Sequence, residues 1–288
     1  MRERFFSALV TVVAVVLLLP AAAASQTPID SGAPPRTAWG DPDLNGTWSY
    51  ASLTPLQRPT SMADKEFFTP EEAAERNYAV TLDQPPRTGD VGSYNALWFD
   101  RGEVSSDRRT SLIVDPPDGR LPVKPETQEQ AAAQRDYRRA HPGDSWLDRS
   151  NWDRCITYRG VPPISTGYNN TYQILQTADY VAIRVENIHD VRIIPLDGRA
   201  QLDDGVRQWN GDSRGHWEGD TLVVETANFS DQTVHRFPSS RNTKAVERFR
   251  VVSKDRIDYQ FTIEDATVYT SPWTAVRPMP RLDDYIMY

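Results

Sequence analysis

The feature that most constrains the fold is a run of short hairpins in the second half of the chain. Each hairpin joins two alternating apolar and polar segments through a turn of two or three residues. The paired segments are residues 172–177 with 180–187, 216–217 with 221–229, and 245–252 with 256–264, and residues 191–196 form a further strand. Strands joined by turns this short are antiparallel neighbours in one sheet. The pattern therefore predicts antiparallel β-structure.

Further strands are expected around Trp48 and in residues 94–101 and 110–114, which brings the expected total to about eight to ten. A series of that size closes most economically into a barrel, because closure removes exposed sheet edges. We therefore expect a mainly β, barrel-like (calycin-like) antiparallel domain with one or two peripheral helices. A two-sheet β-sandwich is the alternative.

Two segments carry helix signals. Thr69 is placed as an N-cap, Pro70 follows at the first helical position and Glu72 completes a capping box, so a helix is predicted to about Asn77. Residues 126–140 are rich in Ala, Gln, Glu and Arg and end at a His-Pro-Gly sequence, which predicts a second helix. Because its apolar face consists mainly of alanines, this helix is expected on the outside of the domain.

Residues 1–24 have the three parts of a cleavable secretory signal peptide. Two arginines precede an apolar stretch at residues 5–19, and Ala22 and Ala24 occupy the −3 and −1 positions of a cleavage site. The apolar stretch is shorter than the roughly 20 residues that span a bilayer, which favours cleavage over a membrane anchor. We expect a periplasmic or secreted protein.

The remainder divides into a flexible leader rich in Pro, Gly and Ser at residues 25–40 and a single β-rich domain at residues 41–288. The 40 acidic against 32 basic residues argue against nucleic acid and, after signal cleavage, membranes as partners. The single cysteine, Cys155, leaves no internal disulfide and lacks the nearby His or glycine-rich context of a nucleophilic thiol. We expect it to be unpaired or buried.

One strand is expected to carry polar groups onto its buried face. Val181, Ile183 and Val185 alternate as its apolar side. If the strand continues without a bulge, Asn187 and His189 point to that same side. Polar groups aligned with a core face are typical of a functional site.

The candidate catalytic residues follow from this alignment. His189 is the side chain whose ordinary pKa lies nearest neutrality, so it is the candidate general acid or base. Asp190 or Glu186 would orient its ring, and Arg192 would hold an anion. The alternative is an ordinary buried histidine beside an ion-paired strand end, since structural ion-pair networks cluster in the same way.

Two further segments are candidates for ligand binding. The stretch from Trp209 to Trp217 brackets charged and polar groups with aromatic rings, and it is interpreted either as an aromatic-walled rim or as a turn with an Asp212–Arg214 ion pair. Its candidate ligand-binding residues are Trp209, Asp212, Arg214, His216 and Trp217. The second segment is Tyr168-Asn169-Asn170, whose amides would orient a polar ligand or form a plain Asx-type turn.

Other kinds of chemistry lack their motifs. The chain contains no G-x-S-x-G, H-E-x-x-H, glycine-rich phosphate loop or C-x-x-C sequence. The four histidines are not spaced as a ligand set, so we expect no metal and no organic cofactor.

Two functions of different class are consistent with these patterns. The first is an enzyme that acts on a small molecule by acid–base chemistry (a lyase, isomerase or hydrolase), with Arg192 and Arg214 stabilising negative charge. The alternative is a secreted binding protein whose aromatic residues hold an apolar or aromatic ligand. A third possibility is a structural or surface-assembly role, for which the interior would be filled and contain no pocket.

Several long motifs are similar to those of one protein family. They are YNALW at residues 94–98, RTSLIVDPPDGR at 109–120, YNN at 168–170, HDVRIIPLDGR at 189–199 and GDSRGHWEGDTLVVET at 211–226. With these motifs the chain resembles a family of exported proteins that are common in soil bacteria and are usually labelled hypothetical. The resemblance covers most of residues 41–288 and implies an exported single domain but no particular activity. It also implies that relatives continue into a further segment containing Cys and His, which would offer Cys155 a partner.

Overall fold

The computed structural model describes residues 34–82, 99–158 and 160–287, which belong to one structural unit. The expected signal peptide and most of the expected strand at 94–101 lie outside these residues. The described part is mainly β, as predicted, and forms two antiparallel sheets. The two sheets are compatible with the sandwich alternative, and the described strands do not close into one continuous barrel.

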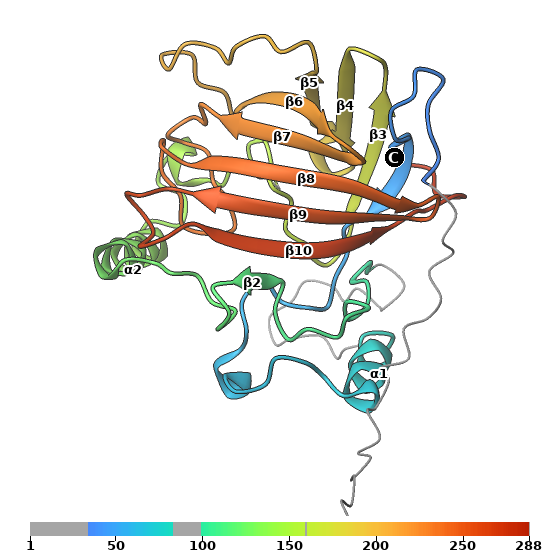
Figure 1. The fold of residues 1–288 in the computed structure, drawn as a ribbon. Helices are drawn as coiled ribbons and strands as arrows, with labels where there is room; N and C mark the ends of the chain where they lie inside the picture. Colours follow the sequence, from blue (N-terminus) through green and yellow to red (C-terminus); the bar gives the residue numbers. More distant parts are fainter. Residues whose placement is uncertain (1–33, 83–98, 159, 288) are drawn as a thin grey trace, which may run out of the picture. The chain divides into compact units, whose positions relative to one another are not determined.

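The smaller sheet has four strands in the order β1-β3-β4-β5, and the larger has six in the order β2-β10-β9-β8-β7-β6 (Figure 1). The smaller sheet consists of β1 (Gly46–Ser49), β3 (Thr171–Gln176), β4 (Tyr180–Val185) and β5 (Val191–Pro195). The larger consists of β2 (Ile113–Asp115), β6 (Asp212–Glu218), β7 (Thr221–Ala227), β8 (Lys244–Ser253), β9 (Arg256–Glu264) and β10 (Trp273–Pro280). The hairpins expected from the turn signals are confirmed as β3–β4, β6–β7 and β8–β9.

Strand β10 is not among the strands expected from the sequence, and it contains Pro278 and Pro280. Proline cannot donate a backbone hydrogen bond, so it is confined to strand edges and bulges. The strand lies between β9 and β2, but β2 pairs only with its first half, at Thr274 and Ala275. Both prolines therefore fall where β10 has no partner on one side.

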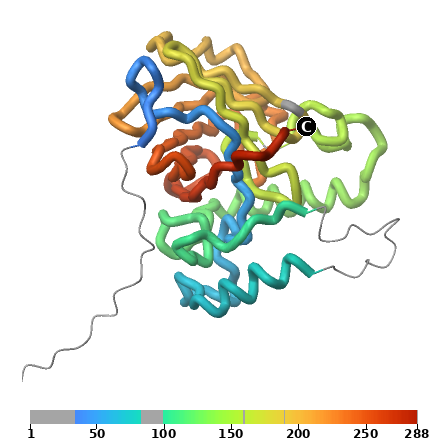
Figure 2. The backbone as a smooth tube through the Cα atoms, turned by 90° about the vertical axis from the view of Figure 1, so that its right-hand side faces the viewer, coloured from blue at the N-terminus to red at the C-terminus, as the bar shows by residue number. Residues whose placement is uncertain are grey.

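The chain links the two sheets where it leaves β10. Arg281 forms an isolated bridge with Trp48 of β1, and the Leu282 N–H donates to the Thr47 carbonyl over 2.8 Å. Figure 2 shows the C-terminal segment in red crossing the blue segment that contains β1. At the other margin β5 lies beside β6 without pairing with it.

The core fills the space between the sheets with large side chains. Strand β9 shows the expected alternation, because its apolar residues are buried and its polar residues face outward. The largest fully buried apolar and aromatic side chains include Trp48, Tyr172, Phe249, Tyr259, Phe261 and Trp273.

Both expected helices are present and lie outside the sheets (Figure 1). Helix α1 (Pro70–Ala79) begins with the predicted capping box between Thr69 and Glu72. Helix α2 (Pro125–Ala140) has no buried residue, which agrees with its alanine-rich face. Across the described ranges, no helix has the length and apolar character that a membrane crossing requires.

Two glycines with left-handed backbone provide a test of the packing before β6. Gly211 and Gly198 have φ values of 70° and 74°. A Cβ on Gly211 would lie 2.6 Å from the Thr226 methyl carbon and 2.7 Å from the Ala227 carbonyl oxygen, whereas one on Gly198 would meet nothing within 4 Å.

We expect Gly198→Ala to lower the free energy of unfolding by about 1–2 kcal/mol, the cost of left-handed backbone alone. Gly211→Ala should cost about 1–3 kcal/mol more, because the methyl group also overpacks its surroundings. Urea denaturation of both variants measures the difference. Equal losses would show that the segment before β6 is less tightly packed than described.

Candidate functional site

The strand that was expected to carry His189 ends early, so that expectation is wrong. Strand β4 stops at Val185, Glu186 has helical backbone angles and Ile188 has a φ of 62°. The Val185 N–H donates to the Asp190 carbonyl over 2.8 Å and closes a turn into β5. A chain that reverses here cannot keep a two-residue alternation. The side chain of His189 lies outside the described residues.

Arg192 and Glu247 form a buried ion pair between the two sheets. Arg192 projects inward from β5, and its Nη1 lies 2.6 Å from Oε2 of Glu247 on β8. The Tyr259 hydroxyl donates to the other carboxylate oxygen over 2.8 Å. Burial is the largest single influence and opposes the charge of Arg192, but Glu247, Tyr172 and Tyr259 together outweigh it and raise the pKa of Arg192.

A small cavity adjoins this ion pair. Its lining includes Tyr172, Asp190, Arg192 and Asn210, and its volume is about 10 Å³, enough for one water molecule. Nη2 of Arg192 is buried and has no hydrogen-bond partner among the described residues. The structure thus brings together two of the four candidate catalytic residues, with Asn210 as a neighbour that the sequence did not single out. An organic substrate does not fit there.

Glu186 faces different surroundings. Its side chain is buried, and Oε1 accepts a hydrogen bond from the Tyr285 hydroxyl. Burial, followed by this hydrogen bond, raises the pKa of Tyr285. Glu186 is not among the residues that line the cavity beside Arg192.

Asp212 and Arg214 form the ion pair of the structural alternative. Their nearest atoms are 2.5 Å apart, and Asp212 also accepts from the Leu202 N–H over 2.8 Å. Arg214 donates to the Ala200 carbonyl over 3.0 Å. Both side chains therefore hold the loop before β6 against that strand.

The other candidates of this stretch do not converge with Arg192. His216 is exposed, with Nε2 at 3.2 Å from Oε1 of Glu218. Trp217 is partly buried and packs on the core, and Trp209 is half-buried. None of the three lines the cavity beside Arg192.

The Tyr168-Asn169-Asn170 segment is a turn whose last amide is already used. The Asn170 side chain accepts from the Thr166 N–H over 2.8 Å and donates to the carbonyls of Thr166 and Asp100. Asn170 is fully buried, whereas Tyr168 and Asn169 are exposed. These contacts fit the Asx-type alternative better than an amide that orients a ligand.

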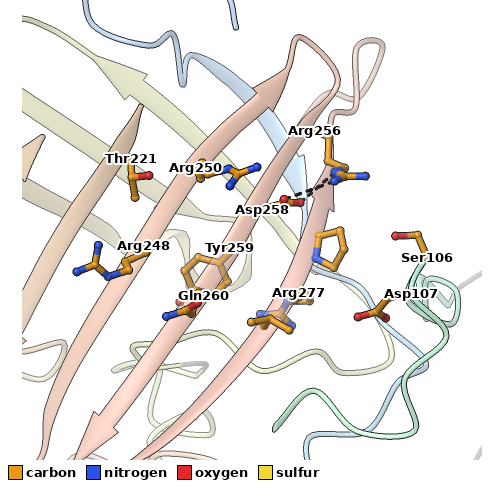
Figure 3. Close-up of a pocket in the computed structure, with 12 residues that line it drawn as sticks. Ser106, Asp107, Thr221, Arg248, Arg250, Arg256, Asp258, Tyr259, Gln260 and Arg277 are labelled. Atoms are coloured by element: carbon orange, nitrogen blue, oxygen red, sulfur yellow. Dashed lines mark hydrogen bonds and ion pairs between the residues drawn. The ribbon is translucent and has the colours of Figure 1, made fainter. Parts of the chain in front are cut away.

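A larger groove lies on the outer face of the six-stranded sheet. Its volume is about 420 Å³, and side chains from β8, β9 and β10 face Ser106 and Asp107 across it (Figure 3). Four arginines line it, namely Arg248, Arg250, Arg256 and Arg277, and we call it the arginine groove.

The three groove arginines on β8 and β9 differ in their partners. Arg256 bonds Asp258 over 3.0 Å, and Arg248 bonds Glu218 over 2.7 Å. Arg250 is exposed and forms no ion pair with any described acidic residue. Its guanidinium therefore has hydrogen-bond donors available to an anion.

A second unpaired cation lies on the inner side of the same sheet. Arg277 of β10 is buried and donates to the carbonyls of Tyr50 and Pro163 over 3.0 and 2.8 Å, but within the described ranges no carboxylate pairs with it. Burial lowers the pKa of Arg277. Arg277 lines the arginine groove together with Val276 and Pro278, so its positive charge adds to the field there.

Only the wall of this groove formed by β8 and β9 could be predicted from the sequence. Period-two alternation places Arg248 and Arg250 on the face opposite Phe249, and the tight hairpin brings Asp258 beside Arg250. The opposite wall is formed by Ser106 and Asp107, which no local sequence pattern connects to β8 or β9.

No family model matches the chain, and neither a curated protein nor a solved structure is similar enough to count as a match. The described side chains contain no group of three or more His, Cys, Asp or Glu residues that could hold a metal ion.

His235 is a buried histidine that no site uses. Its ring lies between Phe229 and Phe237, at centroid distances of 4.9 and 5.0 Å. Neither ring nitrogen has a hydrogen-bond partner among the residues described. Burial lowers the pKa of His235 to about 4.

Replacing one member of the buried ion pair should lower the free energy of unfolding far more than replacing both members. We expect Glu247→Met to lower the free energy of unfolding by about 3–5 kcal/mol, because it leaves Arg192 charged and unpaired in the core. The double variant Arg192→Met/Glu247→Met should recover most of that loss. Chemical denaturation of both variants measures it, and a double variant no more stable than the single one would refute the argument.

The depressed pKa of His235 predicts a stability loss in acid. An unfolded histidine titrates near 6.5, so unfolding takes up a proton between that pH and about 4. Stability should therefore fall as the pH drops through this window, with about 2–3 kcal/mol from His235 between pH 7.5 and 4.5.

His235→Leu should lose that part of the pH dependence, whereas the exposed control His216→Gln should keep it. Urea denaturation at both pH values measures the difference. Identical pH dependence in the wild type and His235→Leu would rule out a neutral, desolvated ring.

Proposed function

We propose that this chain is an exported binding protein for a small anionic molecule, which it holds in the arginine groove. One observation carries the proposal: Arg250 points into a groove of about 420 Å³ without an acidic partner among the described residues. Volumes of several hundred Å³ are typical of small-molecule sites.

The chemistry of the groove favours an anion. A free guanidinium forms two parallel, charge-assisted hydrogen bonds to a carboxylate or phosphate. Thr221 and Gln260 add neutral polar groups that can orient the ligand, and the buried charge of Arg277 supports it from the other side of the sheet.

The acid–base enzyme has weaker support. Its residues Asp190 and Arg192 line a cavity of about 10 Å³, where water fits and a substrate does not. An apolar ligand in the interior has the same difficulty, since the described core is filled with aromatic side chains. A binding site on the outside meets neither obstacle.

Two finer expectations are part of this proposal. The charge and apolar pattern of residues 1–24 supports export to the periplasm or medium. The Trp48–Arg281 bridge and the proximity of β5 to β6 support a barrel-like, calycin-like relation between the two sheets.

We expect at least one of benzoate, citrate, glucuronate and inorganic phosphate to raise the Tm of the protein at low salt, since a ligand that binds only the folded state stabilises it. Arg250→Gln should weaken binding about 10-fold or more, and added NaCl should weaken it in the wild type. Isothermal titration calorimetry measures both effects.

The matched control is Arg138→Gln on α2, which removes the same charge from an exposed position outside the groove. It should bind like the wild type. Absence of binding to all four anions, or an unchanged affinity of Arg250→Gln, would overturn the proposed function.

A further inference from the structure

The arginine groove continues into a second compartment. A neighbouring hollow of about 330 Å³ shares Ser106, Arg256, Arg277 and Pro278 with it. Because the shared residues lie at the boundary, the two hollows form one elongated channel. The channel follows the half of β10 after Val276, which pairs with β9 on one side and has no partner strand on the other.

The second compartment has a different chemical character from the first. We call it the serine compartment after Ser49, Ser52, Ser105 and Ser106, which line it. The hydroxyls of Ser105 and Ser106 form no hydrogen bond to another described residue. Pro278 and Pro280 add apolar ring surface.

Two carboxylates at the serine compartment also lack close partners. Glu103 forms no ion pair with a described basic residue, and Asp255 has only Lys254 at 3.9 Å. They are acceptors for hydroxyl groups, and they repel negative charge. The two arginines of this compartment are already engaged, Arg256 by Asp258 and Arg277 by two backbone carbonyls. A ligand that reaches this compartment must therefore carry hydroxyl donors there rather than a second anion.

We infer that the ligand is an acidic oligosaccharide with one anionic sugar unit in the arginine groove and neutral sugar units in the serine compartment. The inference rests on the proposed function, since it assigns the anion to Arg250. Neutral sugars present hydroxyl donors to Glu103 and Asp255 and C–H faces to Pro278 and Pro280. A fully apolar tail would leave those carboxylates desolvated and unpaired, and a polyanion would be repelled by them.

The test compares four probes by isothermal titration calorimetry: glucuronate, glucuronic acid linked to xylotriose, xylotriose alone and trigalacturonate. We expect the glucuronic acid–xylotriose conjugate to bind at least about 10-fold more tightly than glucuronate, because only the conjugate fills both compartments. Xylotriose alone should bind weakly, and trigalacturonate should bind no better than glucuronate.

Variants test whether the tighter binding of the conjugate depends on the serine compartment. Glu103→Gln/Ser105→Ala should reduce the advantage of the conjugate to about 3-fold or less while glucuronate affinity stays unchanged, and it should improve trigalacturonate binding. Glu126→Gln on α2 is the matched charge control. Arg250→Gln should weaken glucuronate and the conjugate alike.

The outcomes separate the two proposals. Equal affinities of wild-type protein for glucuronate and the conjugate, or tighter binding of trigalacturonate, would overturn the oligosaccharide while an Arg250-dependent site stands. Binding of phosphate, citrate or benzoate without either glucuronate probe would do the same. Absence of binding to every anion would overturn both.

Discussion

The buried charges between the two sheets are the constraint on which the rest of the structure depends. Arg192 reaches from the four-stranded sheet to Glu247 of the six-stranded sheet, and Arg277 reaches back to the Tyr50 carbonyl beyond β1. A buried ion pair adds little net stability, but an arrangement that separates its members leaves a bare charge in the core. The pair therefore disfavours packings of the sheets in which Arg192 and Glu247 do not meet.

Because the interior between the sheets is filled with side chains, the space for a ligand lies on the outer surface of the sheets. Tyr172 and Tyr259 occupy the volume around the ion pair and leave a cavity of about 10 Å³. On the other side of β8–β10, the second half of β10 pairs with β9 alone, because Pro278 and Pro280 cannot donate backbone hydrogen bonds to a further strand. Residues 102–107 lie opposite it. The same strand thus closes the core and forms one wall of the channel.

The features that could be predicted from the sequence are the local ones. Turn signals located the hairpins, and a capping box located α1, because both depend on residues only a few positions apart. The alternation through His189 failed because it extrapolated a strand across a turn. Glu247 was missed as the partner of Arg192 because 55 positions separate them, and the arginine groove was missed because its opposite wall comes from a distant segment.

The register of β8 against β9 determines both which residues enter the core and which line the arginine groove. On β8, Glu247 and Phe249 point inward while Arg248 and Arg250 point outward. A one-residue slip of β8 against β9 would exchange these sets, burying two arginines and exposing the partner of Arg192. Such a slip would cost both the ion pair and the groove, so the forces that hold the interior in register also hold Arg250 where an anion can reach it. The strand register alone therefore positions Arg250 in the groove.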